Sequence, residues 1–185
     1  MSYKKILTWP DKFLMMRAES VNDESDSVLT TIDDMIKTME AEGVVSLAAS
    51  QIGLSKQIIA VDMAPMPLDG VDLYKGRYFV AINPKIVDGF GDITISESCH
   101  TSPGESFFTN RAKYISMEYQ NHKRENSRVN AIDAFSFILQ RLVDSTSGMS
   151  LIDRSDFDRR QKFVTRFYQE LHDDEEDLYT IYGGE

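Results

Sequence analysis

The sequence is poor in cysteine and contains no long hydrophobic run. Cys99 is the single cysteine among 185 residues, which excludes an internal disulfide and favours a reducing compartment. No segment approaches the roughly 20 apolar residues of a membrane span. The first residues, "MSYKKILTWPDKF", lack the apolar run of a secretory signal peptide. These absences predict a mature intracellular protein, located in the cytoplasm.

Positive charge is also scarce. Lysine and arginine number 20 against 30 aspartate and glutamate residues, so the net charge is −10. An acidic chain repels phosphate backbones, which excludes nucleic acid and anionic membranes as main partners. The aspartate and glutamate residues are concentrated in residues 19–42 and in "HDDEED" (172–177). Both blocks are most simply solvated helix faces, although the second can also dock on a basic surface of a partner.

The patterns that are present indicate one α+β domain. Apolar residues at helical spacing predict a helix over about 24–41, a second that begins near 131 and stops at Gly148, and a third over about 156–171. Strands are predicted over 57–63, 77–88, 91–99 and 112–120, with an interruption at Asn83-Pro84. The predicted order is helix, strands, helix, short strand, helix. We divide the chain into a domain of residues 1–154 and a C-terminal helix with an acidic, aromatic tail (155–185) packed on it.

Five short segments, in order along the chain, resemble the peptide deformylase family. "SLAASQIG" (46–53) is similar to the first signature of that family, and "ESCHTSPG" (97–104) is similar to the second. Three further segments resemble the start of the family, its asparagine-proline strand and the segment after its catalytic helix: "ILTWPDKFLMMRAESV" (6–21), "AINPKIVD" (81–88) and "GMSLIDR" (148–154). The resemblance implies a peptide-deformylase-like α+β fold, with antiparallel or mixed sheets packed around a central helix, plus the C-terminal helix.

The resemblance also implies a chemistry. The family holds Fe²⁺ or Zn²⁺ through one cysteine and the two histidines of a histidine-glutamate-x-x-histidine helix, whose glutamate is the general base. The glutamine of the first signature helps to hold the formyl oxygen. Matching the motifs places Cys99 at the cysteine and Gln51 at the glutamine. Counting back from residues 148–154 places Arg141 and Ser145 at the two histidines and Leu142 at the glutamate.

These residue types predict that no catalytic or metal site is intact and that no cofactor is bound. Arginine cannot coordinate a cation, serine is a poor ligand for a divalent transition metal, and leucine cannot accept a proton. Residues 123–171 contain no histidine. His100 adjoins Cys99, and neighbouring strand residues point to opposite faces, so we do not expect the two to share one ion. We expect instead that Arg141 forms a salt bridge with Glu97 or Asp144.

The resulting prediction is a protein that is not an enzyme. It would be a catalytically inactive member of the family that binds other proteins as an interaction or assembly module, with a bacteriophage virion or baseplate as one setting. Remnants of the substrate groove are predicted at Ser46, Leu47, Gln51, Glu97, Cys99 and His100. The end of the chain, "DLYTIYGGE" (177–185), is able to insert into a groove of a neighbour.

Two alternatives stay open. The first is a metal-dependent peptide deformylase with a rebuilt site, which removes the formyl group from nascent polypeptides. The second is a protein that binds formylated N-termini of peptides without cleaving them.

Overall fold

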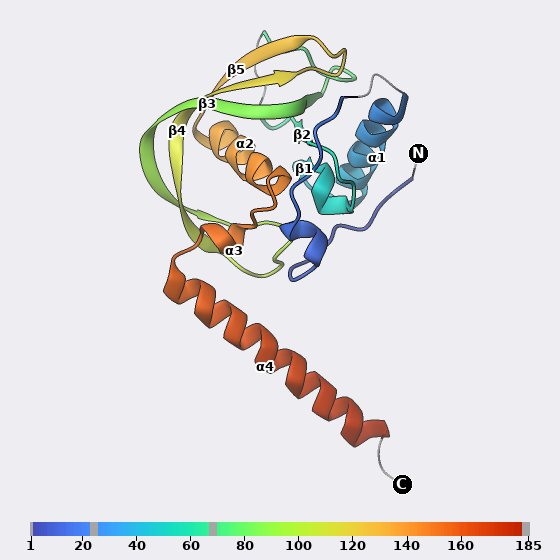
Figure 1. Ribbon diagram of the computed structural model, residues 1–185, viewed down its shortest axis with the longest axis vertical. Coiled ribbons are helices and arrows are strands. Elements are labelled where there is room, and N and C mark those ends of the chain that lie inside the picture. Colours follow the sequence, from blue (N-terminus) through green and yellow to red (C-terminus); the bar gives the residue numbers. More distant parts are fainter. Residues whose placement is uncertain (1, 23–25, 67–69, 183–185) are drawn as a thin grey trace.

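A computed structural model describes residues 2–22, 26–66 and 70–182, although not the side chains of residues 26 and 172–182. The elements, labelled in Figure 1 where there is room, follow in this order: η1 (Lys12–Met15), α1 (Asp26–Glu42), β1 (Ser46–Ala48), η2 (Ala49–Ile52), β2 (Ile58–Asp62), β3 (Tyr78–Glu97), β4 (Phe107–Gln120), β5 (Asn126–Ile132), α2 (Asp133–Thr146), α3 (Leu151–Arg154) and α4 (Phe157–Tyr182). Within the described part of the chain, no helix is both long and apolar enough to cross a membrane.

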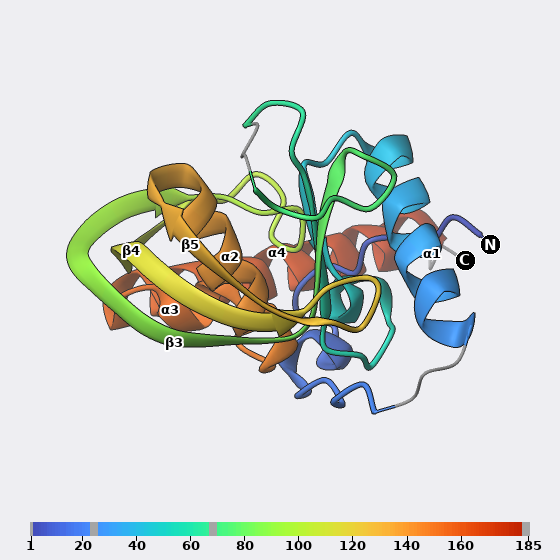
Figure 2. The same cartoon turned by 90° about the horizontal axis from the view of Figure 1, so that it is seen from above.

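The strands form one sheet of five, in the order of the chain from β1 to β5. Every pairing between neighbouring strands is antiparallel. The first part of β3 pairs with β2 and most of the strand pairs with β4, and two register shifts before Asp88 help it to bend around α2 (Figures 1 and 2). The predicted α+β class and the central helix are therefore confirmed, and of the two sheet types expected it is the antiparallel one that occurs.

Both faces of the sheet are covered near β2, which explains why that strand is apolar without interruption. Ile58 and Ala60 belong to the core that includes α1, whereas Ile59 and Val61 belong to the core that includes α2. Successive side chains of a strand point to opposite faces, so a strand between two helices buries every residue. Fully burying an isoleucine stabilises the fold by about 1.5–3 kcal/mol. This double burial fixes α1 and α2 on opposite sides of β1 and β2.

The strand predicted in two pieces, over 77–88 and 91–99, is the single strand β3. Asn83 has a positive φ of 51°, and its side chain accepts the amide of Val21 at 2.8 Å and donates to the carbonyl of Val21 at 2.9 Å. The amide of Asn83 still donates to the carbonyl of Gln57 at 2.8 Å. The asparagine-proline pair therefore makes a bulge tied to the N-terminal segment and does not end the strand.

The helix predicted to begin near 131 begins at Asp133, and the residues before it form β5. Val129 and Ala131 are buried on that strand, so an apolar pattern assigned to the helix belongs in part to the sheet. The short strand predicted before the last helix is the helix α3. Its N-cap is Ser150, whose hydroxyl accepts the amide of Asp153 at 3.3 Å.

The C-terminal helix α4 extends beyond its predicted end at residue 171. Its first turns contact the domain through the ring of Trp9, which lies 5.2 Å from the ring of Phe163 and 5.0 Å from that of Phe167. From there the helix projects away from the sheet (Figure 1). The side chains of the acidic block and of the aromatic end, 172–185, lie outside the described residues. The division at residue 154 stays a prediction.

We predict that Gly148→Ala destabilises the protein by about 3 kcal/mol or more, measured by urea unfolding. Gly148 has a φ of +76°, and an added Cβ would lie 2.7 Å from the carbonyl oxygen of Met15, which is backbone and cannot move aside. Gly43→Ala is the matched control, because Gly43 has a φ of +65° with nothing within 4 Å of the added atom. It should cost only about 1 kcal/mol. Equal losses for the two variants would contradict the close approach.

Candidate functional site

A cavity of about 160 Å³ lies where β1, η2, the turn after β3 and helix α2 meet. It is lined by Ile6, Val44, Val45, Ser46, Leu47, Gln51, Ser98, Cys99, His100, Arg141 and Leu142. The structure therefore brings together seven of the residues singled out from the two signatures and the helix. Ile6 and Ser98 lie within the matched segments but were not singled out, and Val44 and Val45 are additions from outside those segments.

The segment of β1 and η2 presents Gln51 to the cavity. The Oε1 of Gln51 accepts the amide of Ala48 at 2.8 Å, which folds the side chain back over the start of the short helix. The hydroxyl of Ser50 donates to the carbonyl of Ser145 at 3.1 Å and so ties this segment to α2. With Oε1 occupied, the Nε2 group of Gln51 is a donor at the cavity wall, and it has no partner among the described residues.

The turn after β3 presents both Cys99 and His100 to this cavity. The strand ends at Glu97, so the alternation of a strand no longer applies two residues later. The strand alternation on which we based opposite directions for these two side chains therefore does not apply here. The Sγ of Cys99 lies 3.0 Å from the hydroxyl of Thr101 and 3.2 Å from that of Ser102.

Helix α2 contributes Arg141 and Leu142 to the cavity, but not Ser145. The hydroxyl of Ser145 donates to the carbonyl of Arg141 at 3.1 Å, within the helix. Glu97 does not line the cavity either, because it is buried behind the wall with 5% of its surface exposed.

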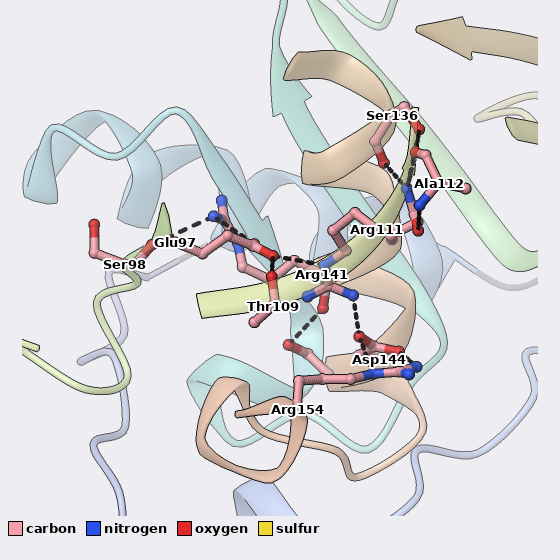
Figure 3. A network of polar contacts seen from close by, with 11 residues as sticks. Glu97, Ser98, Thr109, Arg111, Ala112, Ser136, Arg141, Asp144 and Arg154 are labelled. Atoms are coloured by element: carbon pink, nitrogen blue, oxygen red, sulfur yellow. Dashed lines mark hydrogen bonds and ion pairs between the residues drawn. The ribbon is translucent and has the colours of Figure 1, made fainter. Parts of the chain in front are cut away.

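Glu97 belongs to a buried ionic network centred on Arg111 of β4 (Figure 3). The Nε of Arg111 donates to Glu97 at 2.6 Å and its Nη1 donates to Asp144 at 2.5 Å. Thr109 also donates to Glu97, at 2.5 Å, and Arg154 donates to Asp144 at 2.6 Å. Burial alone would lower the pKa of Arg111, but the two carboxylates outweigh it and raise that pKa. The guanidinium therefore stays charged in the interior.

Arg111 was missed in the sequence because the strand was predicted to begin at residue 112. Arg111 and Thr109 are two residues apart and both are buried, so a strand assigned from residue 107 would have placed a charge at an inward position. A charge there requires a partner. That requirement is the signal that could have found the network.

Arg141 contacts the network only at its edge. Its Nη1 lies 3.5 Å from Glu97 and 3.3 Å from the carbonyl of Ser98, and its Nη2 lies 3.3 Å from the hydroxyl of Ser46. The predicted ion pair with Glu97 is present, although it is longer than the 2.7–2.9 Å of a charge-assisted hydrogen bond. It does not fill the cavity, since Arg141 is part of the lining.

A family model described as polypeptide deformylase matches residues 3–161. The chain belongs to this family. A protein named peptide deformylase from Hamiltonella defensa subsp. Acyrthosiphon pisum is 31% identical to it over 163 residues, which cover 88% of this chain and 90% of that one.

Solved structures of the family have the same fold. The peptide deformylase from Ehrlichia chaffeensis superposes with a TM-score of 0.78 at 27% identity, over 94% of this chain and 99% of that one. The enzyme from Legionella pneumophila superposes with a TM-score of 0.79 at 25% identity, over 92% of this chain and 98% of that one. These likenesses confirm the peptide-deformylase-like fold.

The comparisons correct the prediction that the chain is not an enzyme. Relatives about 31% identical over most of its length are named peptide deformylase, which is the name of an enzyme. The prediction of a pseudoenzyme in a virion or baseplate conflicts with these relatives and is wrong on their evidence. That prediction inferred the loss of all activity from substitutions at three positions. The predicted binding to other proteins stays a prediction.

The side chains of the cavity do not fit the metal ion of the family. Cys99 and His100 are the only members of the lining that commonly bind Fe²⁺ or Zn²⁺, whereas a catalytic zinc site takes three protein ligands. No three histidine, cysteine, aspartate or glutamate residues of the described chain are placed to hold a metal ion together. His122 lies elsewhere, with its ring 5.2 Å from that of Tyr74, and the side chain of His172 is outside the described residues. We therefore derive no step through a metal.

We predict that Arg111→Met lowers the free energy of unfolding by about 3–5 kcal/mol, because it leaves Glu97 and Asp144 buried without their shared cation. Urea unfolding at neutral pH measures the loss. Arg128→Met is the control, because Arg128 pairs with Glu118 at the surface, where the two side chains are 57% and 53% exposed. That variant should change stability by no more than about 1 kcal/mol. A loss for Arg111→Met as small as the control's would contradict the network's role.

Proposed function

We propose that the cavity binds the formylated N-terminus of a polypeptide, the class of substrate that the name of the relatives implies. The observation that carries the proposal is the free Nε2 donor of Gln51 in a cavity whose lining combines apolar side chains with those of Ser46, Cys99, His100 and Arg141. A formyl oxygen is a neutral acceptor of the size and polarity that such a donor takes. The apolar wall of Ile6, Val44 and Leu142 suits the side chain of an N-terminal methionine.

The position of β1 at the edge of the sheet supports the same proposal. Among the strands of the described residues β1 pairs with β2 alone, and the carbonyl of Val45 accepts the amide of Asp62 at 2.8 Å. Because hydrogen bonding alternates along an antiparallel pair, the N–H and C=O of Ser46 point away from β2. An extended peptide whose first residue lies in the cavity can therefore pair with Ser46.

The reaction named by the relatives is removal of the formyl group, which releases formate. Formate release is a direct readout of that reaction and needs no assumption about how water is activated in this cavity. It also requires that the peptide bind. Turnover and binding are therefore measured on the same peptide, formyl-Met-Ala-Ser, with unformylated Met-Ala-Ser as the reference ligand.

We predict that Gln51→Glu weakens binding of formyl-Met-Ala-Ser by about tenfold or more, because it removes one hydrogen bond worth about 1–3 kcal/mol in a buried site. The new carboxylate retains an oxygen for the amide of Ala48, so the local fold is kept while the donor is lost. Isothermal titration calorimetry gives the affinities, and formate is assayed in the same samples.

Gln57→Glu is the matched control. The Nε2 of Gln57 donates to the carbonyl of Ala18 at 3.1 Å, and the residue is not part of the cavity lining. It should leave peptide binding within about twofold of the unchanged protein. Preference for the formylated peptide, or formate release from it, supports the proposal. Equal affinity for both peptides, or none for either, contradicts it.

A further inference from the structure

The guanidinium of Arg141 is the least engaged charge around the cavity. Its side chain is 19% exposed, and its three polar contacts all measure 3.3–3.5 Å. Arginine carries five N–H donors in a planar fork, so these long contacts leave most of its hydrogen-bonding capacity unused. Arg141 therefore lies at the cavity wall with N–H groups available to a ligand.

The carboxylates nearby are already neutralised by other arginines. Glu97 pairs with Arg111 at 2.6 Å. Asp144 pairs with Arg111 at 2.5 Å and with Arg154 at 2.6 Å. The cluster therefore contains three arginines and two carboxylates, which leaves one positive charge in excess. Because Arg141 has the longest ion pair of the group, at 3.5 Å, the excess lies with it.

We infer that the cavity binds a small monocarboxylate, held by the guanidinium of Arg141 with the Nε2 of Gln51 as a second donor. One excess positive charge matches a monoanion, and the planar fork of arginine matches the two oxygens of a carboxylate. Inorganic phosphate carries more negative charge near neutral pH and would exceed the charge that Arg141 offers. Apolar neighbours such as Leu142, of which 1% is exposed, reduce the screening by water and strengthen the contact.

The inference deepens the proposed function, on which it rests for the choice of ligand. Formate is the smallest carboxylate and is the ion that deformylation releases. A site for it in the cavity that takes the formyl group would retain the product and compete with the next peptide. The anion site itself requires only Arg141, Gln51 and the cavity.

The test is a titration of the full chain with sodium formate, at a constant ionic strength of about 0.15 M maintained with sodium chloride, so that long-range charge effects are screened equally throughout. The side-chain resonances of Arg141 Nε and Gln51 Nε2 are followed by ¹H–¹⁵N NMR. We expect both to shift and to saturate with formate and with acetate, and to respond at least about tenfold more weakly to inorganic phosphate. A linear response that does not saturate would overturn the inference.

Two variants and a matched control locate the ligand. Arg141→Met should weaken formate binding by about tenfold or more, whereas Arg141→Lys, which keeps the charge but not the fork, should lose less. Arg128→Met removes one positive charge at a surface residue outside both the cluster and the cavity lining, and it should leave formate affinity within about twofold. Retained binding in Arg141→Met, or an equal loss in Arg128→Met, would overturn the assignment to Arg141.

The two proposals fail separately. Binding of formyl-Met-Ala-Ser without binding of formate overturns only the anion site. Binding of formate without any preference for the formylated peptide overturns only the proposed function. If both ligands bind, formate should compete with the peptide in the unchanged protein and no longer do so in Arg141→Met.

Discussion

The buried guanidinium of Arg111 attaches helix α2 to the paired strands β3 and β4, a connection that strand pairing does not provide. From β4 it reaches Glu97 at the end of β3 and Asp144 on α2, and Asp144 in turn holds Arg154 of α3. Charges in an interior are tolerated only when each has a partner at good geometry. Because the turn after β3 and the helix α2 form two walls of the cavity, this one cation sets the distance between them.

The sheet supplies the third wall. The β1–η2 segment is held between the two helices by the double burial around β2. Gln51 lies on η2, and its side chain caps the start of that short helix by accepting the amide of Ala48. A hydrogen-bond donor held in place by its own side-chain cap, at a cavity lined by both apolar and polar residues, can bind a ligand whatever reaction follows. Function depends on such local groups and not on the fold that holds them. The likeness to peptide deformylases thus covers nearly the whole chain, while the chemistry of the cavity depends on Gln51, Cys99, His100 and Arg141.

Much of the fold was predictable from local pattern and motif. The α1 helix, the core of α2 and most of β2 and β4 follow from apolar periodicity, and the motifs identified the family and most of the cavity lining. β5 was missed because part of its apolar pattern, at Ala131, was assigned to the following helix, and α3 was predicted as a strand because four residues are too few to show a period. The prediction of an inactive, structural role was wrong. It rested on substitutions at Arg141, Leu142 and Ser145, which concern one site, whereas the similarity to proteins named peptide deformylase extends over most of the chain.

The sequence by itself determined the inventory of groups: a single cysteine, no histidine in residues 123–171, and an arginine on the helix face that the cavity uses. These are local properties, which need no folding to be read. Only the tertiary structure decided that Cys99 and His100 line one cavity, that Arg111 neutralises Glu97, and that the guanidinium of Arg141 has no close carboxylate partner. Arg141 and Glu97 are 44 residues apart, and a contact over that separation depends on how the helix packs into the bend of the sheet, which no local pattern encodes.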